Sequence, residues 1–194
     1  MISAIILAAG EAKRMGKLKQ LLPLGQSTIL EKTIENVASS RVDETIVVLG
    51  YQAEKIISRI NSAPVKIIVN PLYQDGMSTS IIAGLMAIET EADAVMLVLA
   101  DQPFIDSQII NHMLDEYKSH NKGIVIPVHR GKRGHPVIIS LRYKSELLNL
   151  KGDIGAREVI PRHSDDVHEV KVGSPRITLD IDTEENYKSL QPKS

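Results

Sequence analysis

The chain has 194 residues, and its 23 Lys and Arg against 24 Asp and Glu give a formal net charge of −1. That balance, with aromatic residues at only 3%, excludes the basic, base-stacking surface that binds bulk nucleic acid. The absence of Cys excludes disulfides, thiol nucleophiles and thiolate metal sites. The longest apolar stretches fall far short of the ~20 residues that cross a bilayer, so we expect no membrane association. Without a basic leader before the first apolar segment, we expect a cytoplasmic protein.

Short apolar runs and helically spaced segments alternate along the chain. The runs show little polar alternation, which is typical of strands buried on both faces, and they cover residues 4–8, 45–49, 65–69, 94–99 and 124–127. Between them, apolar residues recur at intervals of three and four, which predicts helices over 30–38, 53–60, 81–86 and 109–117. Candidate N-caps for three of these helices are Ser27, Ser78 and Asp106.

These repeated units predict an α/β fold with a mostly parallel central sheet and helices on both faces. After about residue 131 the pattern changes to shorter pieces. We expect a strand at 137–139, helices near 143–148 and 155–160, and strands around 167–170 and 177–181. The sequence therefore predicts a single domain over residues 1–194, in which a later part, about 129–190, faces a substrate.

The first predicted strand leads into the loop AAGEAKRMGKLK at residues 8–19. Ligands of open parallel sheets bind at the carboxyl ends of the strands. This loop combines Gly10 and Gly16 with Lys13, Arg14, Lys17 and Lys19, a composition that suits phosphate groups. It matches neither the Walker A pattern nor the dinucleotide pattern G-x-G-x-x-G. The alternative is an ordinary solvated turn rich in lysine.

A second polar loop, NPLYQDGMSTS, spans residues 70–80. Gly76 permits an unusual backbone angle, and three hydroxyls follow at Ser78, Thr79 and Ser80. They could form a wall for a nucleotide base and ribose, or they could cap the following helix.

Asp101 follows the apolar strand predicted at 94–99, in the segment LADQP. A carboxylate at the mouth of a central strand needs a partner, and a hard divalent cation such as Mg²⁺ is the best candidate. Capping of the turn before Pro103 is the alternative.

Near the end of the chain, Asp180 and Asp182 lie on one side of an extended segment, and either could supply a second metal carboxylate. For Asp182, capping of the helix that follows is an equal competitor, because Glu185 lies three residues on.

Two segments of the later part carry further charge. The run HRGKRGHP over 129–136 is a candidate second anion site, and a solvated charged face is its alternative. The segment GDIGAR contains Asp153 and Arg157, and a lone arginine there usually makes only a weak surface pair. Two anion sites with a carboxylate pair between them indicate transfer of a phosphoryl-type group between two phosphorylated molecules.

The chain resembles the molybdenum cofactor cytidylyltransferase branch of the molybdopterin nucleotidyltransferase family in six segments: LAAGEAKRMGKLKQLLP, NPLYQDGMSTS, LADQP, GHP, GDIGAR and DIDTEENY. The match runs from Leu7 to Tyr187. It implies a Rossmann-like, glycosyltransferase-A-like three-layer nucleotidyltransferase fold, with the nucleotide-binding part at about 1–128. It also implies Mg²⁺-dependent transfer of CMP from CTP to the terminal phosphate of molybdopterin-bound molybdenum, with release of pyrophosphate. Delivery of the product to an enzyme like xanthine dehydrogenase is implied as well.

The resemblance assigns roles by position. The nucleotide-binding residues would be Leu7, Ala8, Ala9, Gly10, Arg14, Lys19, Gly76, Ser78, Thr79 and Ser80. The catalytic residues would be Arg14, Lys19 and Asp101. Asp101 and Asp182 would bind the metal, and the residues facing the pterin substrate would be His135, Asp153 and Arg157.

Three positions depart from the usual family pattern. Ala12 stands where Ser is usual, Glu184 where Pro is frequent, and Asn186 where Asp is frequent. None is a proposed metal ligand. The L-A-A-G at 7–10 favours CTP, because the guanylyl branch resembles L-A-G-G. The alternatives are a transferase that uses GTP or acts on a sugar or polyol phosphate, a non-catalytic cofactor carrier, and a scaffold that senses nucleotides.

Overall fold

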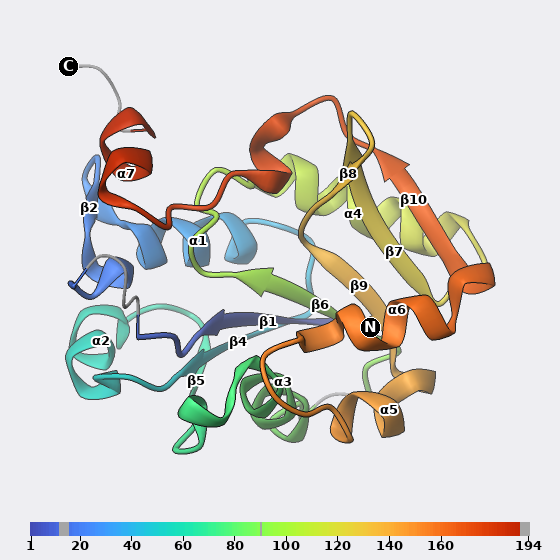
Figure 1. Cartoon of the computed structure of the whole chain (residues 1–194), viewed down its shortest axis with the longest axis horizontal. Helices are drawn as coiled ribbons and strands as arrows, with labels where there is room; N and C mark the ends of the chain where they lie inside the picture. Colours follow the sequence, from blue (N-terminus) through green and yellow to red (C-terminus); the bar gives the residue numbers. More distant parts are fainter. Residues whose placement is uncertain (12–15, 90, 191–194) are drawn as a thin grey trace.

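A mixed, mostly parallel sheet forms the centre of the computed structural model, which describes residues 1–11, 16–89 and 91–190 (Figure 1). The main path of the sheet runs in the order β10-β7-β9-β6-β1-β4-β5. Its strands are β1 (Ile2–Ala8), β4 (Glu44–Leu49), β5 (Lys66–Val69), β6 (Ala94–Leu99), β7 (Ile124–His129), β9 (Val137–Ser140) and β10 (Val167–Lys171). β1 pairs in parallel with β4 and β6, whereas β9 lies antiparallel between β6 and β7. The predicted fold class is confirmed.

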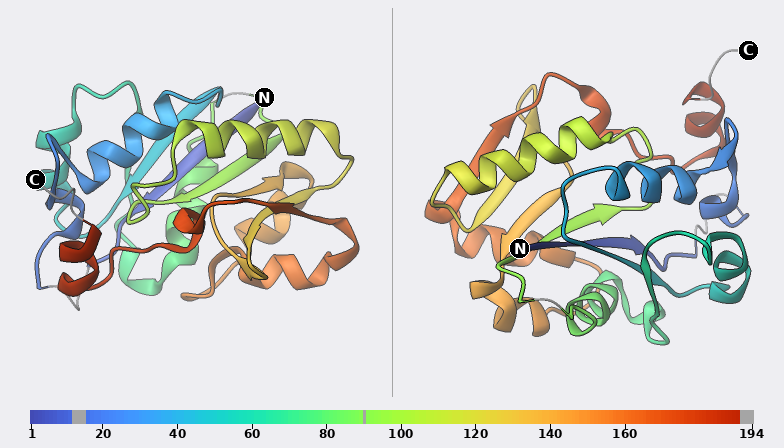
Figure 2. Two further views of the ribbon diagram at one scale, coloured as in Figure 1. Left: turned by 90° about the horizontal axis from the view of Figure 1, so that it is seen from above. Right: turned by 180° about the vertical axis from the view of Figure 1, so that it is seen from behind.

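Helices cover both faces of this sheet, as the two views of Figure 2 show. One face carries α1 (Ile29–Ala38), α2 (Ala53–Ile60) and α4 (Ser107–Ser119). The other face carries α3 (Met77–Met86), α5 (Lys144–Leu148) and α6 (Val159–Arg162). The remaining short strands are β2 (Pro23–Leu24), β3 (Ser27–Thr28) and β8 (Lys132–Arg133), and the last helix is α7 (Glu184–Leu190). No helix within the described ranges has the length and apolar character that a membrane span requires.

Side-chain alternation along β1 divides the core into two halves. Ala4 and Ile6 pack with the side chains of α1, α2 and α4, whereas Ile5 packs with α3, α5 and α6. Ile5 and Ile6 are fully buried, and burial of such a side chain stabilises the fold by about 1.5–3 kcal/mol. Because both faces are covered, β1 contains an uninterrupted apolar run, as its sequence predicted.

Two of the three predicted N-caps are wrong. α1 is capped by Thr28 and not by Ser27: the Thr28 hydroxyl accepts from Glu31 N–H while the Glu31 carboxylate accepts from Thr28 N–H. α3 begins after Gly76, so Ser78 lies inside the helix. Asp106 does cap α4 by accepting from Ile109 N–H at 3.0 Å.

The strand predicted over 177–181 is also wrong. A 3₁₀ turn, η6 (Pro175–Thr178), begins this segment. Its backbone bonds go to loops and not to a strand ladder: His135 N–H donates to Ile177 O, and Ile181 N–H donates to Asp101 O, both at 3.0 Å. Ile177 and Ile181 are fully buried, so their apolar spacing anchors the segment across the end of the sheet. Asp180 and Asp182 are thereby brought beside the mouth of β6.

Candidate active site

A single ammonium group joins the two acids that the sequence placed far apart. Lys19 Nζ lies 2.7 Å from Asp101 Oδ2 and 2.8 Å from Asp182 Oδ1. Lys19 stands in the 3₁₀ turn η1 (Lys19–Leu21), Asp101 follows β6, and Asp182 precedes α7. The Lys19 and Asp101 side chains are only 16% and 20% exposed, and that of Asp182 is 43% exposed. Burial works against the ammonium, but the two carboxylates raise the pKa of Lys19 above its ordinary value.

The acid pair has the chemistry of a site for a hard divalent cation. Asp101 Oδ1 is buried and has no hydrogen-bond partner among the described residues, and such an atom ordinarily requires a ligand, an ion or a water. Asp101 and Asp182 already direct one oxygen each toward the same cationic nitrogen. Carboxylate oxygens are the ligands that Mg²⁺ and Mn²⁺ prefer. Asp101 and Asp182 therefore fit a divalent metal ion, which would take the position that the Lys19 ammonium occupies between them.

Asp180 occupies a different environment from Asp182. Its carboxylate accepts a hydrogen bond from the Gln102 amide. Burial raises the pKa of Asp180, the Gln102 bond opposes that rise, and the charges of Asp101 and Asp182 add to it. Thr183, not Asp182, caps the last helix, since its hydroxyl accepts from Asn186 N–H at 3.1 Å. The capping role considered for Asp182 is therefore wrong, and Asp182 is the acid that shares Lys19 with Asp101.

The opening loop is held by a residue that the sequence analysis missed. Gln20 is buried, and its amide donates to Ala8 O and Gly10 O, both at 3.0 Å. These two bonds fix the end of β1 against η1 and thus place Lys19. The sequence carries no local signal that marks this glutamine as buried. Arg14, predicted to contact phosphates, lies outside the described residues.

A cavity of about 230 Å³ opens beside the acid pair. Of the residues predicted to bind nucleotide, it is lined by Leu7, Ala8, Ala9, Gly10, Lys19 and Ser80. Asp101 and Gln20 complete the polar side, and Tyr73 and Met77 add apolar surface. Glycine at position 10 leaves open space where a side chain would begin. The cavity thus combines an accessible backbone with the ammonium of Lys19 and the carboxylates of Asp101 and Asp153.

The other predicted nucleotide residues serve the local structure of α3. Gly76 has a φ of +105°, and a Cβ there would lie 2.4 Å from the Gly152 carbonyl carbon. Gly152 O accepts from Ser78 N–H at 3.1 Å, and Asp153 Oδ1 accepts from Met77 N–H at 3.1 Å. The Thr79 hydroxyl donates within this loop and accepts from Asn70. The loop around Gly152 therefore caps α3 from outside, which is why Ser78 is not needed as a cap.

A second cavity, of about 360 Å³, shares a wall with the first. Leu7, Met77, Leu99 and Asp153 line both. Its far side holds His135 and Arg157 together with Arg133 and Ile160. All three residues predicted to face the second substrate, His135, Asp153 and Arg157, thus meet at one cavity next to the first.

His135 enters this cavity as a neutral ring. Burial lowers its pKa below the ordinary value of 6.5, a backbone contact with Leu97 opposes that shift, and the charge of Arg157 adds to it. Its Nδ1 is buried without a partner among the described residues. A neutral imidazole offers one donor and one acceptor, so His135 is suited to hydrogen bonding with a heterocycle more than to neutralising a phosphate.

We expect His135 to make the stability of the protein pH-dependent. Because the pKa is depressed in the folded state, the unfolded chain binds the proton first as pH falls through 6.5. The free energy of unfolding therefore keeps its full value above pH 6.5. It decreases as the pH falls from there to the folded-state pKa, by no more than about 1.4 kcal/mol per pH unit. Urea unfolding of wild type and His135→Gln between pH 5 and 8 checks this. Parallel pH profiles of the two proteins would contradict it.

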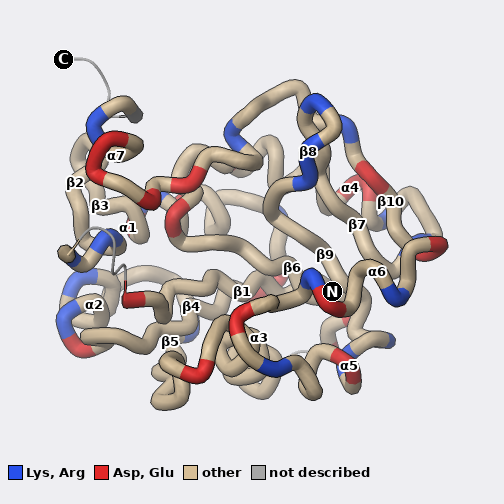
Figure 3. Tube along the Cα trace, viewed as in Figure 1, with Lys and Arg blue, Asp and Glu red and all other residues tan. Residues whose placement is uncertain are grey.

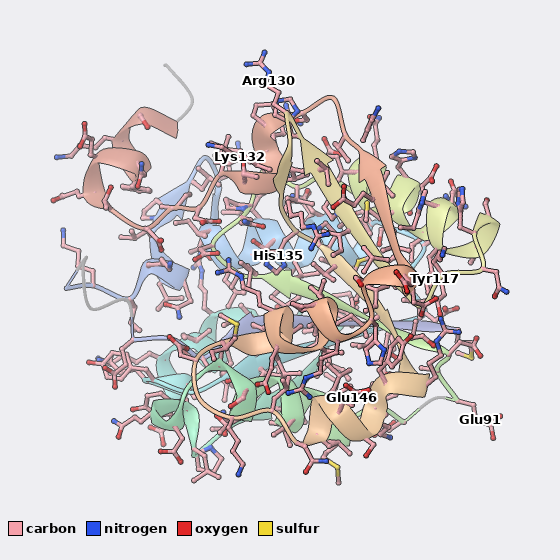
Figure 4. All side chains as sticks on the ribbon, turned by 45° about the vertical axis from the view of Figure 1, so that its right-hand side comes forward. Glu91, Tyr117, Arg130, Lys132, His135 and Glu146 are labelled. Carbon is pink, nitrogen blue, oxygen red and sulfur yellow. The ribbon has the colours of Figure 1, made fainter. Side chains whose placement is uncertain are left out.

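Most of the basic run at 129–136 faces solvent. Arg130 and Gly131 form the turn of the β7–β8 hairpin with positive φ angles of 50° and 78°. Arg130 and Lys132 are exposed, whereas His135 is partly buried. Figure 4 shows Arg130 at the tip of the hairpin and His135 nearer the centre of the view, and Figure 3 shows blue Lys and Arg positions along β8. Arg133 pairs with Glu169 at 2.7 Å. Of the charged and histidine side chains in this run, Arg133 and His135 line the second cavity. The predicted second anion site is therefore limited to these two residues.

Comparison with known proteins agrees with this geometry. Residues 4–167 match the model of the MobA-like NTP transferase domain. The chain is 32% identical over 187 residues to a protein named molybdenum cofactor cytidylyltransferase from Escherichia coli, covering 96% of this chain and 93% of that one. It is 28% identical over 200 residues to nicotine blue oxidoreductase of Paenarthrobacter nicotinovorans, with 97% and 96% covered.

Among solved structures, the manganese complex of Rv0371C from Mycobacterium tuberculosis superposes with a TM-score of 0.83 at 26% identity. The similarity covers 97% of each chain. The matched fold therefore extends beyond the nucleotide-side cavity to the later part of the chain, including the segment that carries Asp182.

Proposed function

Because this chain belongs to the MobA-like NTP transferase family, we propose that it transfers CMP from CTP to the terminal phosphate of molybdopterin-bound molybdenum, releasing pyrophosphate. The observation that carries the proposal is the convergence of Lys19, Asp101 and Asp182 at the mouth of a cavity lined by the backbone of residues 8–10. A second cavity with its own polar groups adjoins this one. Two neighbouring substrates beside one ion site are what nucleotidyl transfer requires.

We propose that the first cavity holds the nucleotide, with Gly10 and Lys19 on its phosphates and Ser80 toward the ribose. Arg14 completes the phosphate contacts. Asp101 and Asp182 would hold a divalent cation, which would neutralise negative charge on the α-phosphate and on the departing pyrophosphate. Mg²⁺ suits this role, since it binds through one or two carboxylates and substrate phosphates.

No general base is required for the reaction. The acceptor is a phosphate monoester, whose second pKa of about 6 leaves it mostly dianionic near neutrality. An oxygen of this phosphate forms a bond to the α-phosphorus, and the bond from that phosphorus to the β-phosphate oxygen breaks, so the electron pair leaves with pyrophosphate. The main barrier is repulsion between the two anionic substrates, and the positive charge of Lys19 lowers it. The two adjoining cavities lower the activation free energy further by aligning the substrates.

His135, Asp153 and Arg157 hold the acceptor in the second cavity in this proposal. Arg157 offers a fixed cationic fork for an anionic group, and neutral His135 offers hydrogen bonds to the pterin. The product is released to an enzyme that uses the dinucleotide form, of which a xanthine dehydrogenase-like molybdoenzyme is the proposed example.

The test is incubation of the protein and Mg²⁺ with molybdopterin and each of the four nucleoside triphosphates, followed by mass analysis. We expect the cytosine dinucleotide and one pyrophosphate per product, with CTP preferred. A guanine dinucleotide would assign the GTP-dependent reaction instead. In parallel incubations with sugar and polyol phosphates, release of pyrophosphate only with those acceptors would change the acceptor. Binding of the pterin without product would show a carrier and overturn the proposal.

A further inference from the structure

A second group of metal-ligating side chains lies away from the acid pair. Glu116 and His120 stand one turn apart on α4, and His168 projects from β10. One ligand atom from each residue can be chosen so that all three lie within 4.8 Å of one another. Neither the acceptor cavity nor the nucleotide-side cavity includes any of these three residues in its lining.

Local structure brings the three residues together. The spacing of four between Glu116 and His120 places both on one face of α4. Along β10, His168 and Val170 share a face, and buried Val170 packs into the core half that contains α4. β10 is the edge strand of the sheet, so the cluster joins that edge to the helix covering it.

The three side chains already converge without an ion. His168 Nε2 lies 2.7 Å from Glu116 Oε2, and His120 Nδ1 lies 3.5 Å from the same oxygen. The two imidazole rings stack with centroids 3.8 Å apart at an angle of 18°. His120 is exposed, so its ring can turn to bring a ring nitrogen to the same point as Glu116 Oε2 and His168 Nε2.

The cluster and the acid pair lie at opposite ends of the sheet, measured along the strands. His168 pairs in register with Val125, near the start of β7, and β6 and β7 run in the same direction because both are antiparallel to β9. Asp101, by contrast, follows the end of β6.

We propose that Glu116, His120 and His168 form a binding site for a transition-metal dication of the Zn²⁺ type. Two imidazoles and one carboxylate are a donor set typical of Zn²⁺ and its neighbours, with ligand distances of about 2.0–2.2 Å. Water completes the coordination, because the site opens at His120. The oxygen-only acid pair suits Mg²⁺ or Mn²⁺ instead, so the two sites select different metals by ligand chemistry. The bound ion ties the edge strand to α4.

The test uses the full-length Asp101→Asn protein, in which the acid pair is disabled, titrated with Zn²⁺ against a chromophoric chelator. We expect one Zn²⁺ per chain and an increase in Tm of about 5–11 °C at a hundredfold excess over Kd. His120→Gln and His168→Gln should each weaken binding by at least about tenfold. His163→Gln is the matched control, because His163 contacts Glu146 at 2.7 Å without belonging to the three-ligand cluster, and it should leave Zn²⁺ binding unchanged.

Electron paramagnetic resonance of the Cu²⁺-loaded protein provides a second measurement. Coupling to two imidazole nitrogens is expected, with one lost in each cluster variant. Because His120 is exposed, its replacement preserves the fold even if His168→Gln does not fold. Equal Zn²⁺ affinity in the Asp101→Asn protein with and without His120→Gln, or no binding below about 1 mM, would overturn the site. Transfer activity with Mg²⁺ should be the same in His120→Gln and wild type, so this proposal and the proposed function fail independently.

Discussion

Asp101→Asn should lower turnover by at least about 100-fold, the scale for loss of one key electrostatic group in a site. The change keeps the shape of the side chain but removes the charge that Asp101 shares with Asp182 around the cation site. Since Lys19 retains Asp182 as a partner, the fold should persist. Steady-state kinetics at saturating Mg²⁺, with circular dichroism and Tm as checks on folding, measure both effects.

The two acids at the end of the chain provide the matched comparison. Asp182→Asn should cause a loss comparable to that of Asp101→Asn, because both carboxylates face the same cationic position. Asp180→Asn keeps an acceptor for the Gln102 amide and should cost much less. Near-normal turnover of Asp101→Asn would refute the metal assignment, and a larger loss in Asp180→Asn than in Asp182→Asn would exchange the roles of those two residues.

Lys19→Gln should have opposite effects on turnover and on metal binding. Without the ammonium, the phosphates lose a cation, and turnover should fall by about 100-fold or more. The carboxylates of Asp101 and Asp182, however, lose the group that competes with a divalent ion for their oxygens. Mn²⁺ affinity in the absence of nucleotide should therefore rise by about tenfold, as measured by paramagnetic relaxation of water protons.

Lys17→Gln is the control for that experiment. It removes the same charge from the same loop, but Lys17 is exposed and is not a partner in the bonds that join Lys19 to the acids. Its Mn²⁺ affinity should stay within about twofold of wild type. If Lys19→Gln instead weakens Mn²⁺ binding, the ammonium supports the metal site and does not compete with the ion for the carboxylates.

The regular elements of the first 128 residues could be predicted because their signals are local. The apolar run over residues 4–8 and the periodicity of residues 53–60 each indicate one element without reference to the rest of the chain. The antiparallel position of β9 between β6 and β7 had no such signal, since it depends on pairing between distant segments. The wrong strand at 177–181 has a related cause: Ile177 and Ile181 are buried by the end of the sheet and not within it.

The site shows the same division between local and long-range information. Loop positions after strands indicated Asp101 and the opening loop. The spacing of two indicated Asp180 and Asp182 as alternatives, and the resemblance to a family favoured Asp182. The contact of Lys19 with both acids follows only when residues 82 and 163 positions away in sequence come together. Gln20 and Gln102 were missed because a buried glutamine is identified by its surroundings, which the sequence does not display. His135 lines the second cavity, and its role toward a substrate stays a prediction. The lowering of its pKa depends on burial, which the sequence does not display.

Diffraction from crystals soaked with Mn²⁺ and CTP tests the central claim most directly. Anomalous scattering locates the ion. The account predicts Mn²⁺ in contact with one oxygen each of Asp101 and Asp182, with Lys19 Nζ moved from the acids to the phosphates. An ion that touches neither acid, or Lys19 still paired with both acids while the nucleotide is bound, would contradict it.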